Sequence, residues 1–294
     1  MNNFREYLQA GSLDEALELL SGKENSALVA GGTDLLLELR QGRHPFVERL
    51  VDVSQIAGIR SIVKEGDWIK IGAGVTHKQI ISSELLREHA HCVVEGCGLI
   101  GGPQVRNVAT IGGNVAHALP AGDGTVSLLA LDTQVELVTD QGSSWQPLIG
   151  IFDGPGKVNF NRGKTILAGF RFAAKADGEG SAFQRVMRPQ GVAIAILNMA
   201  GWVKLVNGKI SQVRIACGPA GPKPFRAFQT ENYLAGKEWN NDSFEEAVEI
   251  IAGEVSLRTS AHRATKEYRH YLLPVLLRMV LDQAVERAGS KKVE

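Results

Sequence analysis

The sequence predicts an α+β protein in which short buried strands and amphipathic helices follow one another. Two short apolar runs bounded by polar residues or glycine, 27–30 and 166–172, are typical of strands. Ser12-Leu-Asp-Glu15 forms a capping box in front of a segment with helical apolar spacing. Helical spacing also dominates the last stretch of about 70 residues. Because strands and helices are mixed along the chain, neither an all-α nor an all-β class fits.

The first part of the chain is expected to alternate between helices and strands. In order, these elements are a helix from the Ser12 cap through Leu20, a strand over Ala27–Ala30, a helix over Leu35–Arg40 and a strand over Leu50–Val53. Gly42 ends the second helix. The first strand leads directly into Gly31-Gly32-Thr33-Asp34, so this tetrapeptide is expected to lie between a strand and a helix.

A longer mixed segment follows. In order, it is expected to contain a strand at Trp68–Gly72, a helix capped by Thr76 and Gln79 that runs through Leu86, a helix that includes Glu95–Ile100, a hairpin formed by Gln134–Thr139 and the residues after Gly142, and a strand at Ile166–Phe172. A glycine-rich stretch over 101–124 interrupts this pattern.

The best domain boundary is Lys175–Gly180, which is charged and contains two glycines. Beyond it, Ala193–Val206 and Ile210–Cys217 are two apolar runs joined by Asn207-Gly208, a strong hairpin signal. Two further helices are expected, one over Phe244–Ile251 and a long one from about residue 261 to 288.

Composition excludes several classes of protein. The 294 residues include 32 Lys+Arg and 32 Asp+Glu, so there is no basic excess of the kind that nucleic-acid binders carry. No apolar run approaches the roughly 18 residues of a membrane span; the best one, 192–200, is interpreted as a buried strand. With three cysteines and no secretory signal at the N-terminus, the expected location is the cytoplasm, with no disulfide framework.

Two glycine-rich loops are the strongest candidates for a ligand site. Ala30-Gly31-Gly32-Thr33-Asp34 opens a helix, whose N-terminus favours an anion. Thr110-Ile111-Gly112-Gly113-Asn114 follows the polar segment Gln104-Val-Arg-Asn107. Paired glycines allow the backbone to approach a ligand closely and to direct N–H groups at it. One such pair alone is more often a tight turn, but two pairs flanked by Thr and Asp or Asn favour a diphosphate cofactor.

Two other patterns carry less weight. Gly96-Cys-Gly98-Leu-Ile-Gly101 matches the dinucleotide fingerprint G-x-G-x-x-G, but its glycines fall inside an expected helix and Pro103 stands where a new helix should begin. Cys92, Cys97 and Cys217 have no C-x-x-C spacing, so we expect buried thiols and no bound metal.

The two loops resemble a known family. Ala30–Asp34 and the long string Gly102–Asn114 are similar to the FAD-binding (medium) subunits of molybdenum hydroxylases of the xanthine dehydrogenase and carbon monoxide dehydrogenase type. The resemblance extends over nearly the whole chain. It includes Asp123, Gly154-Pro-Gly-Lys157, Ile166-Leu167 and Lys266-Glu-Tyr-Arg269.

The resemblance implies a two-part FAD-binding domain of the vanillyl-alcohol-oxidase (PCMH) type over 1–174, with parts at about 1–58 and 59–174. A smaller C-terminal domain with a three-stranded sheet and helices would cover 180–290. It further implies that both loops hold the FAD diphosphate with help from Thr33 and Thr110, that Asn114 and Asp123 lie along the ribityl-diphosphate part, and that Leu167 packs against a ring of the cofactor. The cofactor-binding residues implied are Val29, Ala30, Gly31, Gly32, Thr33, Asp34, Leu35, Thr110, Ile111, Gly112, Gly113, Asn114, Asp123, Leu167 and Gln184.

Two positions depart from the family pattern. Gln184 stands where relatives often have Lys, and Arg188-Pro-Gln-Gly-Val192 lacks the acidic residue that many relatives carry near the flavin. For Asp123, an N-cap of a helix over 125–131 is the structural alternative to a role in cofactor binding.

The function implied is that of an electron-transfer subunit in a heterotrimer with a molybdenum-cofactor subunit and a [2Fe-2S] subunit. Electrons would pass from the iron–sulfur clusters to FAD and on to NAD⁺ or another acceptor, so the chain itself needs no nucleophile and base. Two alternatives stay open: a stand-alone flavin-dependent oxidoreductase of the same fold, and an assembly protein that has lost the flavin. The C-terminal segment is short for the first, and the glycines of both loops argue against the second.

Overall fold

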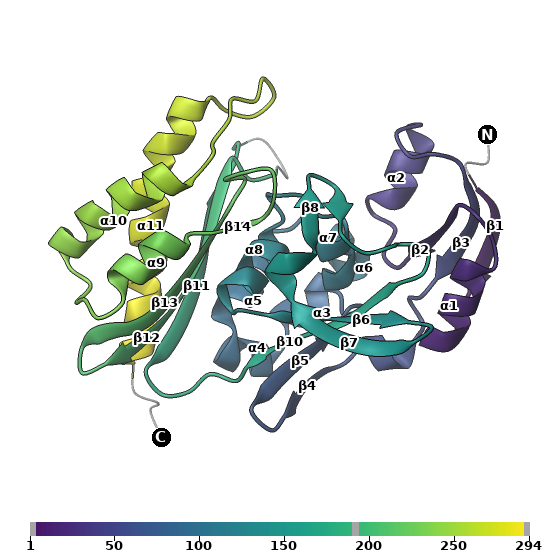
Figure 1. Ribbon diagram of the computed structural model, residues 1–294, viewed down its shortest axis with the longest axis horizontal. Helices are drawn as coiled ribbons and strands as arrows, with labels where there is room; N and C mark the ends of the chain where they lie inside the picture. The colour runs from purple at the N-terminus through teal and green to yellow at the C-terminus, as the bar shows by residue number, and fades with distance from the viewer. Residues whose placement is uncertain (1–3, 190–193, 291–294) are drawn as a thin grey trace.

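The computed structural model describes residues 4–189 and 194–290. Within the described residues, three sheets of three or more strands follow one another along the chain, each with its own helices, and a two-stranded sheet lies within the middle segment (Figure 1). The expected domain boundary, between residues 174 and 180, falls where the second of these sheets ends and the third begins. On that basis we propose a division into the domains 1–174 and 180–290. The loop Arg188–Val192 and the start of the expected strand at Ala193 fall partly outside the described residues.

The N-terminal sheet is parallel, with the order β1-β3-β2. Its strands are β1 (Phe4–Gln9), β2 (Ser26–Val29) and β3 (Val47–Asp52), accompanied by helices α1 (Leu13–Ser21) and α2 (Leu35–Arg40). Ser12 caps α1 by accepting a hydrogen bond from the Glu15 backbone N–H. The loop after β2 leaves from the carboxyl end of a parallel strand, where ligands of such sheets bind.

The middle sheet is antiparallel and has the order β4-β5-β10-β6-β7. Its strands are β4 (Ile62–Glu65), β5 (Trp68–Gly72), β6 (Gln134–Thr139), β7 (Gly142–Pro147) and β10 (Ile166–Ala173). Six helices accompany them: α3 (His77–Ile81), α4 (Glu84–His89), α5 (His91–Gly98), α6 (Pro103–Val108), α7 (Ile111–Ala116) and α8 (Asp123–Ala130). The short elements η1 (Ala57–Ile59), η2 (Leu148–Ile151), β8 (Phe152–Gly154) and β9 (Lys157–Val158) complete the segment.

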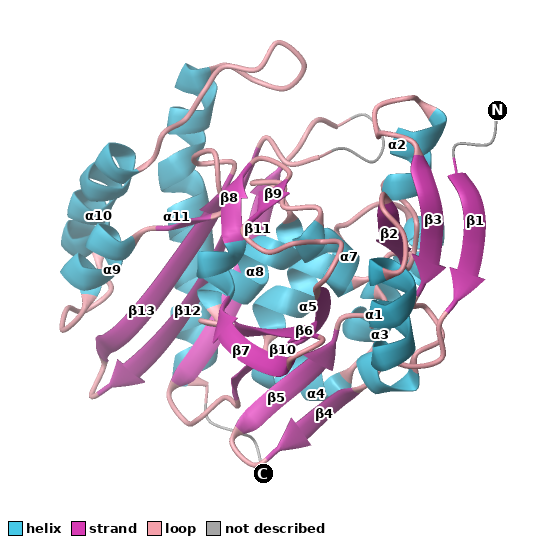
Figure 2. Ribbon diagram, turned by 45° about the vertical axis from the view of Figure 1, so that its right-hand side comes forward, coloured by secondary structure: helices cyan, strands magenta, loops and turns pink. Residues whose placement is uncertain are grey.

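The C-terminal sheet is antiparallel and lies between helices on both faces (Figure 2). It consists of β11 (Glu179–Val186), β12 (Leu197–Val206), β13 (Lys209–Gly218) and β14 (Phe225–Arg226), followed by α9 (Phe228–Leu234), α10 (Asn241–Glu254) and α11 (Lys266–Gly289). Helix α11 crosses one face closely, because a Cβ at Gly180 would come within 2.2 Å of the Ala284 carbonyl oxygen. Helices α5 and α8 pack on the other face, where Phe183 and Trp202 join the core of the middle segment.

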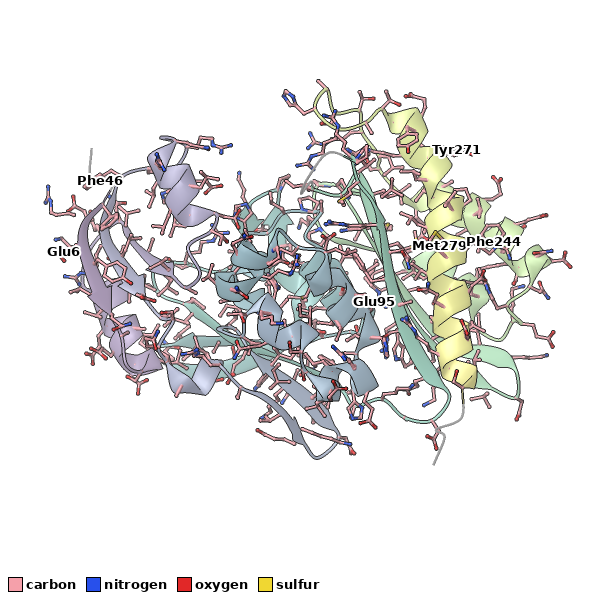
Figure 3. All side chains as sticks on the ribbon, turned by 180° about the vertical axis from the view of Figure 1, so that it is seen from behind. Glu6, Phe46, Glu95, Phe244, Tyr271 and Met279 are labelled. Atoms are coloured by element: carbon pink, nitrogen blue, oxygen red, sulfur yellow. The ribbon has the colours of Figure 1, made fainter. Side chains whose placement is uncertain are left out.

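Polar contacts also connect α5 to the C-terminal sheet. Glu95, labelled in Figure 3, lies where these two parts meet. Its carboxylate pairs with Arg287 at 2.5 Å and accepts a hydrogen bond from the Phe183 backbone N–H at 2.8 Å. Arg287 in turn donates to the Ser181 carbonyl. The middle segment and the C-terminal sheet therefore share a continuous core and a polar seam.

Several sequence expectations need correction. Strands β1, β4 and β11 were missed, and the C-terminal sheet has a fourth strand, β14, of two residues. Pro103 opens α6 at its first position rather than stopping the chain, which suits a residue that lacks an N–H. The helix expected from Thr76 through Leu86 is divided, because Ser83 caps a new helix with its side chain. Helix α11 begins at Lys266, after the Thr265 cap.

The three cysteines are fully buried, as expected. Burial raises the pKa of the Cys92 thiol to about 12 and raises that of Cys97 and Cys217 as well. Such thiols are protonated at neutral pH and behave as small apolar groups. Within the described residues no helix is long and apolar enough to cross a membrane, and no cluster of His, Cys, Asp or Glu has metal-site geometry.

Candidate functional site

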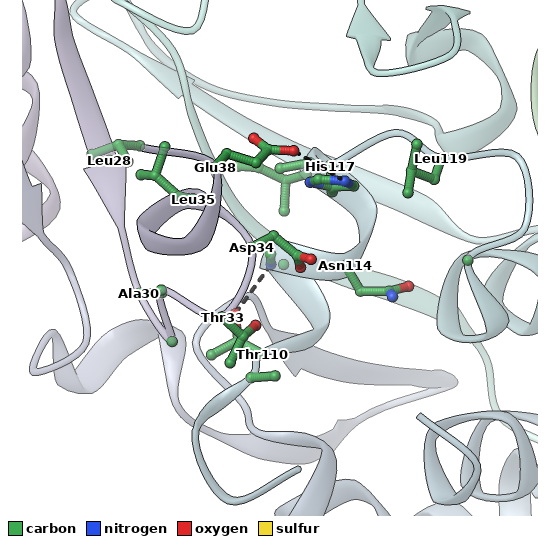
Figure 4. Close-up of a pocket in the computed structure, with 18 of the residues that line it drawn as sticks. Leu28, Ala30, Thr33, Asp34, Leu35, Glu38, Thr110, Asn114, His117 and Leu119 are labelled. Atoms are coloured by element: carbon green, nitrogen blue, oxygen red, sulfur yellow. Dashed lines mark hydrogen bonds and ion pairs between the residues drawn. The ribbon is translucent and has the colours of Figure 1, made fainter. Parts of the chain in front are cut away.

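One large, open cavity of about 1180 Å³ is lined by all three parts of the molecule. It is lined by the β2–α2 loop, helix α7, the start of β10, residue Arg185 of β11 and the segment between α10 and α11. Ordinary ligand pockets are about 300–1,000 Å³, so this cavity has room for a cofactor of dinucleotide size. Figure 4 shows its floor, where the two glycine-rich loops lie next to each other.

The two loops are held in contact by a glycine. A Cβ on Gly31 would come within 2.1 Å of the Val108 carbonyl oxygen, in the segment that leads into the second loop. No other residue fits there, because the obstacle is backbone rather than a movable side chain. Segments about 80 residues apart therefore meet at a single cavity wall, as the pairing of the loops predicts.

The first loop presents unused backbone donors to the cavity. Among the described residues, no acceptor is bonded to the backbone N–H groups of 31–35, whereas Leu36 N–H already bonds the Gly32 carbonyl. Gly32 has φ +66, a left-handed conformation that suits glycine and turns the chain into α2. The Thr33 hydroxyl also lacks a protein partner within the described residues, which leaves it free to donate to a ligand.

The second loop uses its donors differently. The N–H groups of Ile111, Gly112, Gly113 and Asn114 all bond within the protein: to Val75 O, Ala73 O, Thr110 Oγ1 and Thr110 O. Thr110 thus caps α7 and keeps only its hydroxyl proton for a ligand. This loop therefore forms part of the cavity wall. The expectation that its backbone N–H groups bind a phosphate is wrong for residues 111–114, because those groups are already bonded.

Asn114 supplies the side-chain donor of the second loop. Its Oδ1 accepts from both the backbone N–H and the hydroxyl of Thr125, each at 3.1 Å. These two bonds fix the amide orientation and leave Nδ2 available toward the cavity, which Asn114 lines. Figure 4 shows Asn114 beside Thr33 and Asp34 of the first loop.

Asp123 is buried at the far wall and belongs to a network between domains. Its Oδ2 pairs with Arg185 Nη1 at 2.5 Å, and its Oδ1 accepts from Asn198 Nδ2 at 2.6 Å. Burial raises the pKa of Asp123, while Arg185 and Asn198 oppose this rise. Asp123 is the first residue of α8 and makes no side-chain cap, so the N-cap alternative is wrong. Its carboxylate instead holds the Arg185 guanidinium at the cavity wall.

Other titratable groups line the same space. His77 is buried, its Nδ1 has no hydrogen-bond partner, and burial followed by the positive charge of Arg106 lowers its pKa to about 4. It therefore presents a neutral imidazole at physiological pH. Glu38 faces His117 at 3.9 Å (Figure 4), and Arg162 donates to the Ala116 and Gly156 carbonyls.

The structure brings almost all of the predicted residues to this cavity; only Ile111 and Gln184 lie outside its lining. Ile111 is fully buried in the core. Gln184 points to the opposite face of β11, where it donates to Gln283 of α11 at 3.2 Å. Arg185 takes that place, because neighbouring residues of a strand face opposite sides.

Two family models cover the chain. The FAD binding domain in molybdopterin dehydrogenase matches residues 2–172, and the CO dehydrogenase flavoprotein C-terminal domain matches residues 181–284. The chain belongs to this family.

Relatives of known name agree over the full length. The chain is 31% identical over 293 residues to the xanthine dehydrogenase FAD-binding subunit of Escherichia coli O157:H7, covering 99% of each. It is 28% identical over 244 residues to the carbon monoxide dehydrogenase medium chain of Hydrogenophaga pseudoflava, covering 83% of this chain and 84% of that one. A solved carbon monoxide dehydrogenase from Hydrogenophaga pseudoflava superposes with TM-score 0.91 at 27% identity, covering 96% and 98% of the two chains. The chain is thus an FAD subunit of the xanthine and CO dehydrogenase type.

The cavity fits FAD. The open N–H groups of 31–35, Thr33 and Asn114 form a set of donors suited to a diphosphate. Apolar side chains such as Leu28, Leu119 and Leu167 line other parts of the cavity and suit flat ring systems.

Proposed function

We propose that this subunit passes electrons between protein partners and a soluble acceptor. Electrons would come from iron–sulfur clusters on a [2Fe-2S] subunit, after a molybdenum-cofactor subunit has oxidised the substrate. They would leave for NAD⁺ or another acceptor, in a cytoplasmic heterotrimer. FAD supplies the redox chemistry when bound, because a flavin exchanges electrons singly or in pairs.

The residues of the chain bind and orient the cofactor in this proposal. The N–H groups of 31–35 and the Thr33 hydroxyl hold the diphosphate, and Asn114 Nδ2 donates to the same region. Gly31 and Gly112 serve the fold, because a Cβ on either would meet backbone atoms within 3 Å. Leu167 packs against a ring of the cofactor. Asp123 acts through Arg185, whose guanidinium it positions.

The observation that carries the proposal is the position of the cavity. Both domains line it, so a cofactor placed there contacts the FAD-binding domain on one side and Arg185, Arg258 and Arg263 of the C-terminal domain on the other. Among the relatives, one is named a medium chain of carbon monoxide dehydrogenase and another a subunit of a dehydrogenase complex. A subunit of this kind needs only to bind the cofactor and leave it reachable, and the chain supplies donors and apolar walls for that purpose.

The test is to express the chain with its genomic neighbours and purify the complex. We expect one FAD per subunit, co-purification with an iron–sulfur subunit, and slow or absent substrate oxidation by the isolated chain. Anaerobic addition of NADH to the isolated holo-subunit should bleach the visible flavin band if NAD⁺ is the acceptor. Full substrate turnover by the isolated subunit would contradict the proposal and favour a stand-alone oxidoreductase.

A further inference from the structure

The outer face of helix α11 carries an apolar row of side chains. Tyr268, Tyr271, Val275 and Met279 follow one another at spacings of three and four residues, which places them on one side of a helix. These residues are between 40% and 71% exposed. Figure 3 shows α11 on the outside of the C-terminal domain, with Tyr271 and Met279 labelled along it. We call these four residues the α11 stripe.

The α11 stripe is unusual for a helix face that meets solvent. The opposite face of α11 is apolar as well, because Leu272, Leu276 and Val280 are buried in the core beneath it. A surface helix normally carries polar residues on its outer side, and a helix that is apolar all round is normally buried. Within the described residues, the hydroxyls of Tyr268 and Tyr271 bond no other group. Aromatic residues and Met are enriched in protein interfaces, so the stripe has the composition of a docking surface.

The order of residues along the helix is symmetric about Val275. Tyr271 lies four residues before Val275, and Met279 lies four residues after it. Tyr268 and Asp282 lie seven residues away on the two sides. In an antiparallel pair of α11 helices with Val275 on the two-fold axis, Tyr271 would therefore face Met279 of the second copy, which is a favourable contact of sulfur with an aromatic ring. A two-fold interface uses the same surface on both copies, and this stripe meets that requirement.

The charges at the end of the stripe favour the same arrangement. Asp282 and Glu286 are exposed and continue the row toward the C-terminus. Asp282 Oδ1 accepts from Trp239 Nε1 at 2.6 Å, and within the described residues its Oδ2 has no partner. In the antiparallel pair, Oδ2 can accept from the Tyr268 hydroxyl of the second copy, as a charge-assisted hydrogen bond. A parallel pair would instead place the acidic ends of both helices side by side, where they repel.

We propose that the α11 stripe binds a second copy of this chain, with the two α11 helices antiparallel and Val275 on the two-fold axis. The contact from Tyr268 to Asp282 is about 21 Å long at the 1.5 Å rise per residue of a helix. A single helix face is narrower than an interface of standard size, so the dimer should be weak, with a Kd of about 1–100 μM. The inference depends on α11 alone and not on the electron acceptor or on the contents of the cavity.

The first experiment tests the register by disulfide cross-linking of the full chain. Val275→Cys places one thiol of each copy at the two-fold axis, within the roughly 7 Å between Cα atoms that a disulfide allows. Tyr268→Cys is the matched control, because it is similarly exposed but the two copies of this position would lie about 21 Å apart. The three native cysteines are buried, so they do not compete. We expect a covalent dimer of Val275→Cys and none of Tyr268→Cys. Cross-linking at 268 but not at 275 would overturn the proposed pairing.

The second experiment measures the mass of the FAD-loaded chain by analytical ultracentrifugation over a range of concentrations. Val275→Glu brings two carboxylates together at the axis and should abolish the dimer, while Tyr268→Phe should raise the dimer Kd about tenfold. Val206→Glu, at an exposed valine of the β12–β13 hairpin, is the control that should leave the dimer intact.

FAD content and urea unfolding should be unchanged in all these variants, because the altered side chains are exposed and lie outside the cavity lining. A chain that stays monomeric at every concentration would overturn the proposal, and so would a dimer that survives Val275→Glu. Binding of a different subunit that Val275→Glu abolishes, with no dimer of the chain alone, would assign the α11 stripe to that subunit and also refute a second copy.

Discussion

Gly113→Val offers a sharp test of the cofactor site, because the surroundings of Gly113 differ from those of its neighbour Gly112. Gly113 is exposed to the cavity, and a Cβ there meets only Thr110 Oγ1, at 3.2 Å. A Cβ on Gly112 would instead come within 2.6 Å of the Ala73 carbonyl oxygen. The two glycines of one pair therefore have different roles: Gly112 permits packing, and Gly113 keeps the cavity open.

The magnitudes follow from these contacts. Valine is slightly better than glycine inside a helix, so Gly113→Val should change the free energy of unfolding of the apo-protein by less than about 1 kcal/mol. Its branched side chain would fill space beside Asn114 and Thr110 and keep the diphosphate from their donors. Loss of two hydrogen bonds to a charged group corresponds to at least ~100-fold in FAD affinity. Gly112→Ala should instead cost about 1–3 kcal/mol of stability through overpacking.

The assay combines urea unfolding of the apo-protein with FAD titration followed by flavin fluorescence. We expect a stable Gly113→Val protein that does not retain FAD, and a Gly112→Ala protein whose main defect is stability. Gly32→Val should also lose FAD, but its φ of +66 adds backbone strain, so it tests the site less cleanly. Stoichiometric FAD in a folded Gly113→Val protein would refute the reasoning.

Three further predictions follow. Asn114→Asp keeps the side-chain shape and the Thr125 contacts but places a carboxylate where a donor should face the diphosphate. FAD affinity should therefore fall at least ~10-fold, with little change in the stability of the apo-protein. Equal FAD affinity in the variant would remove Asn114 from the site. Asp123→Ala leaves Arg185 buried and unpaired, so the free energy of unfolding of the apo-protein should fall by about 3–5 kcal/mol. A smaller fall, measured by chemical denaturation, would show that Arg185 finds another partner. His77 has a pKa of about 4 against an ordinary 6.5, so the stability from its neutral form is present above pH 6.5 and lost as pH falls toward 4, by up to about 3 kcal/mol. His77→Phe should flatten that part of the stability curve, and an unchanged slope would contradict the low pKa.

Local sequence signals were enough for the elements with strong boundaries. Leu35–Arg40, Trp68–Gly72 and Gln134–Thr139 are observed with the bounds expected, because glycine or hairpin residues delimit them. The turn Asn207-Gly208 has positive φ at both residues, as a tight hairpin between twisted strands requires. The two glycine loops were likewise visible as a pair, since their residue types suit close backbone approach.

Other elements were invisible to local patterns. β11 follows directly on the charged segment 175–178, and its burial on both faces comes from helices α11 and α5, which lie far away in sequence. Because it shows no alternation of polar and apolar residues, the facing of Gln184 and Arg185 was inaccessible. The division of the helix after Thr76 depends on the Ser83 side chain competing for backbone donors, which residue spacing does not reveal.

The sequence by itself determined the fold class, the cofactor family and the two loops that meet at the cavity, because these depend on residues adjacent in the chain. Only the tertiary structure decided which donors remain open. The same Gly-Gly pattern leaves its N–H groups unused at 31–35 but bonds them internally at 111–114. Only the folded chain places Asp123 against Arg185. This pairing joins residues that are distant along the chain, so long-range packing alone fixes it.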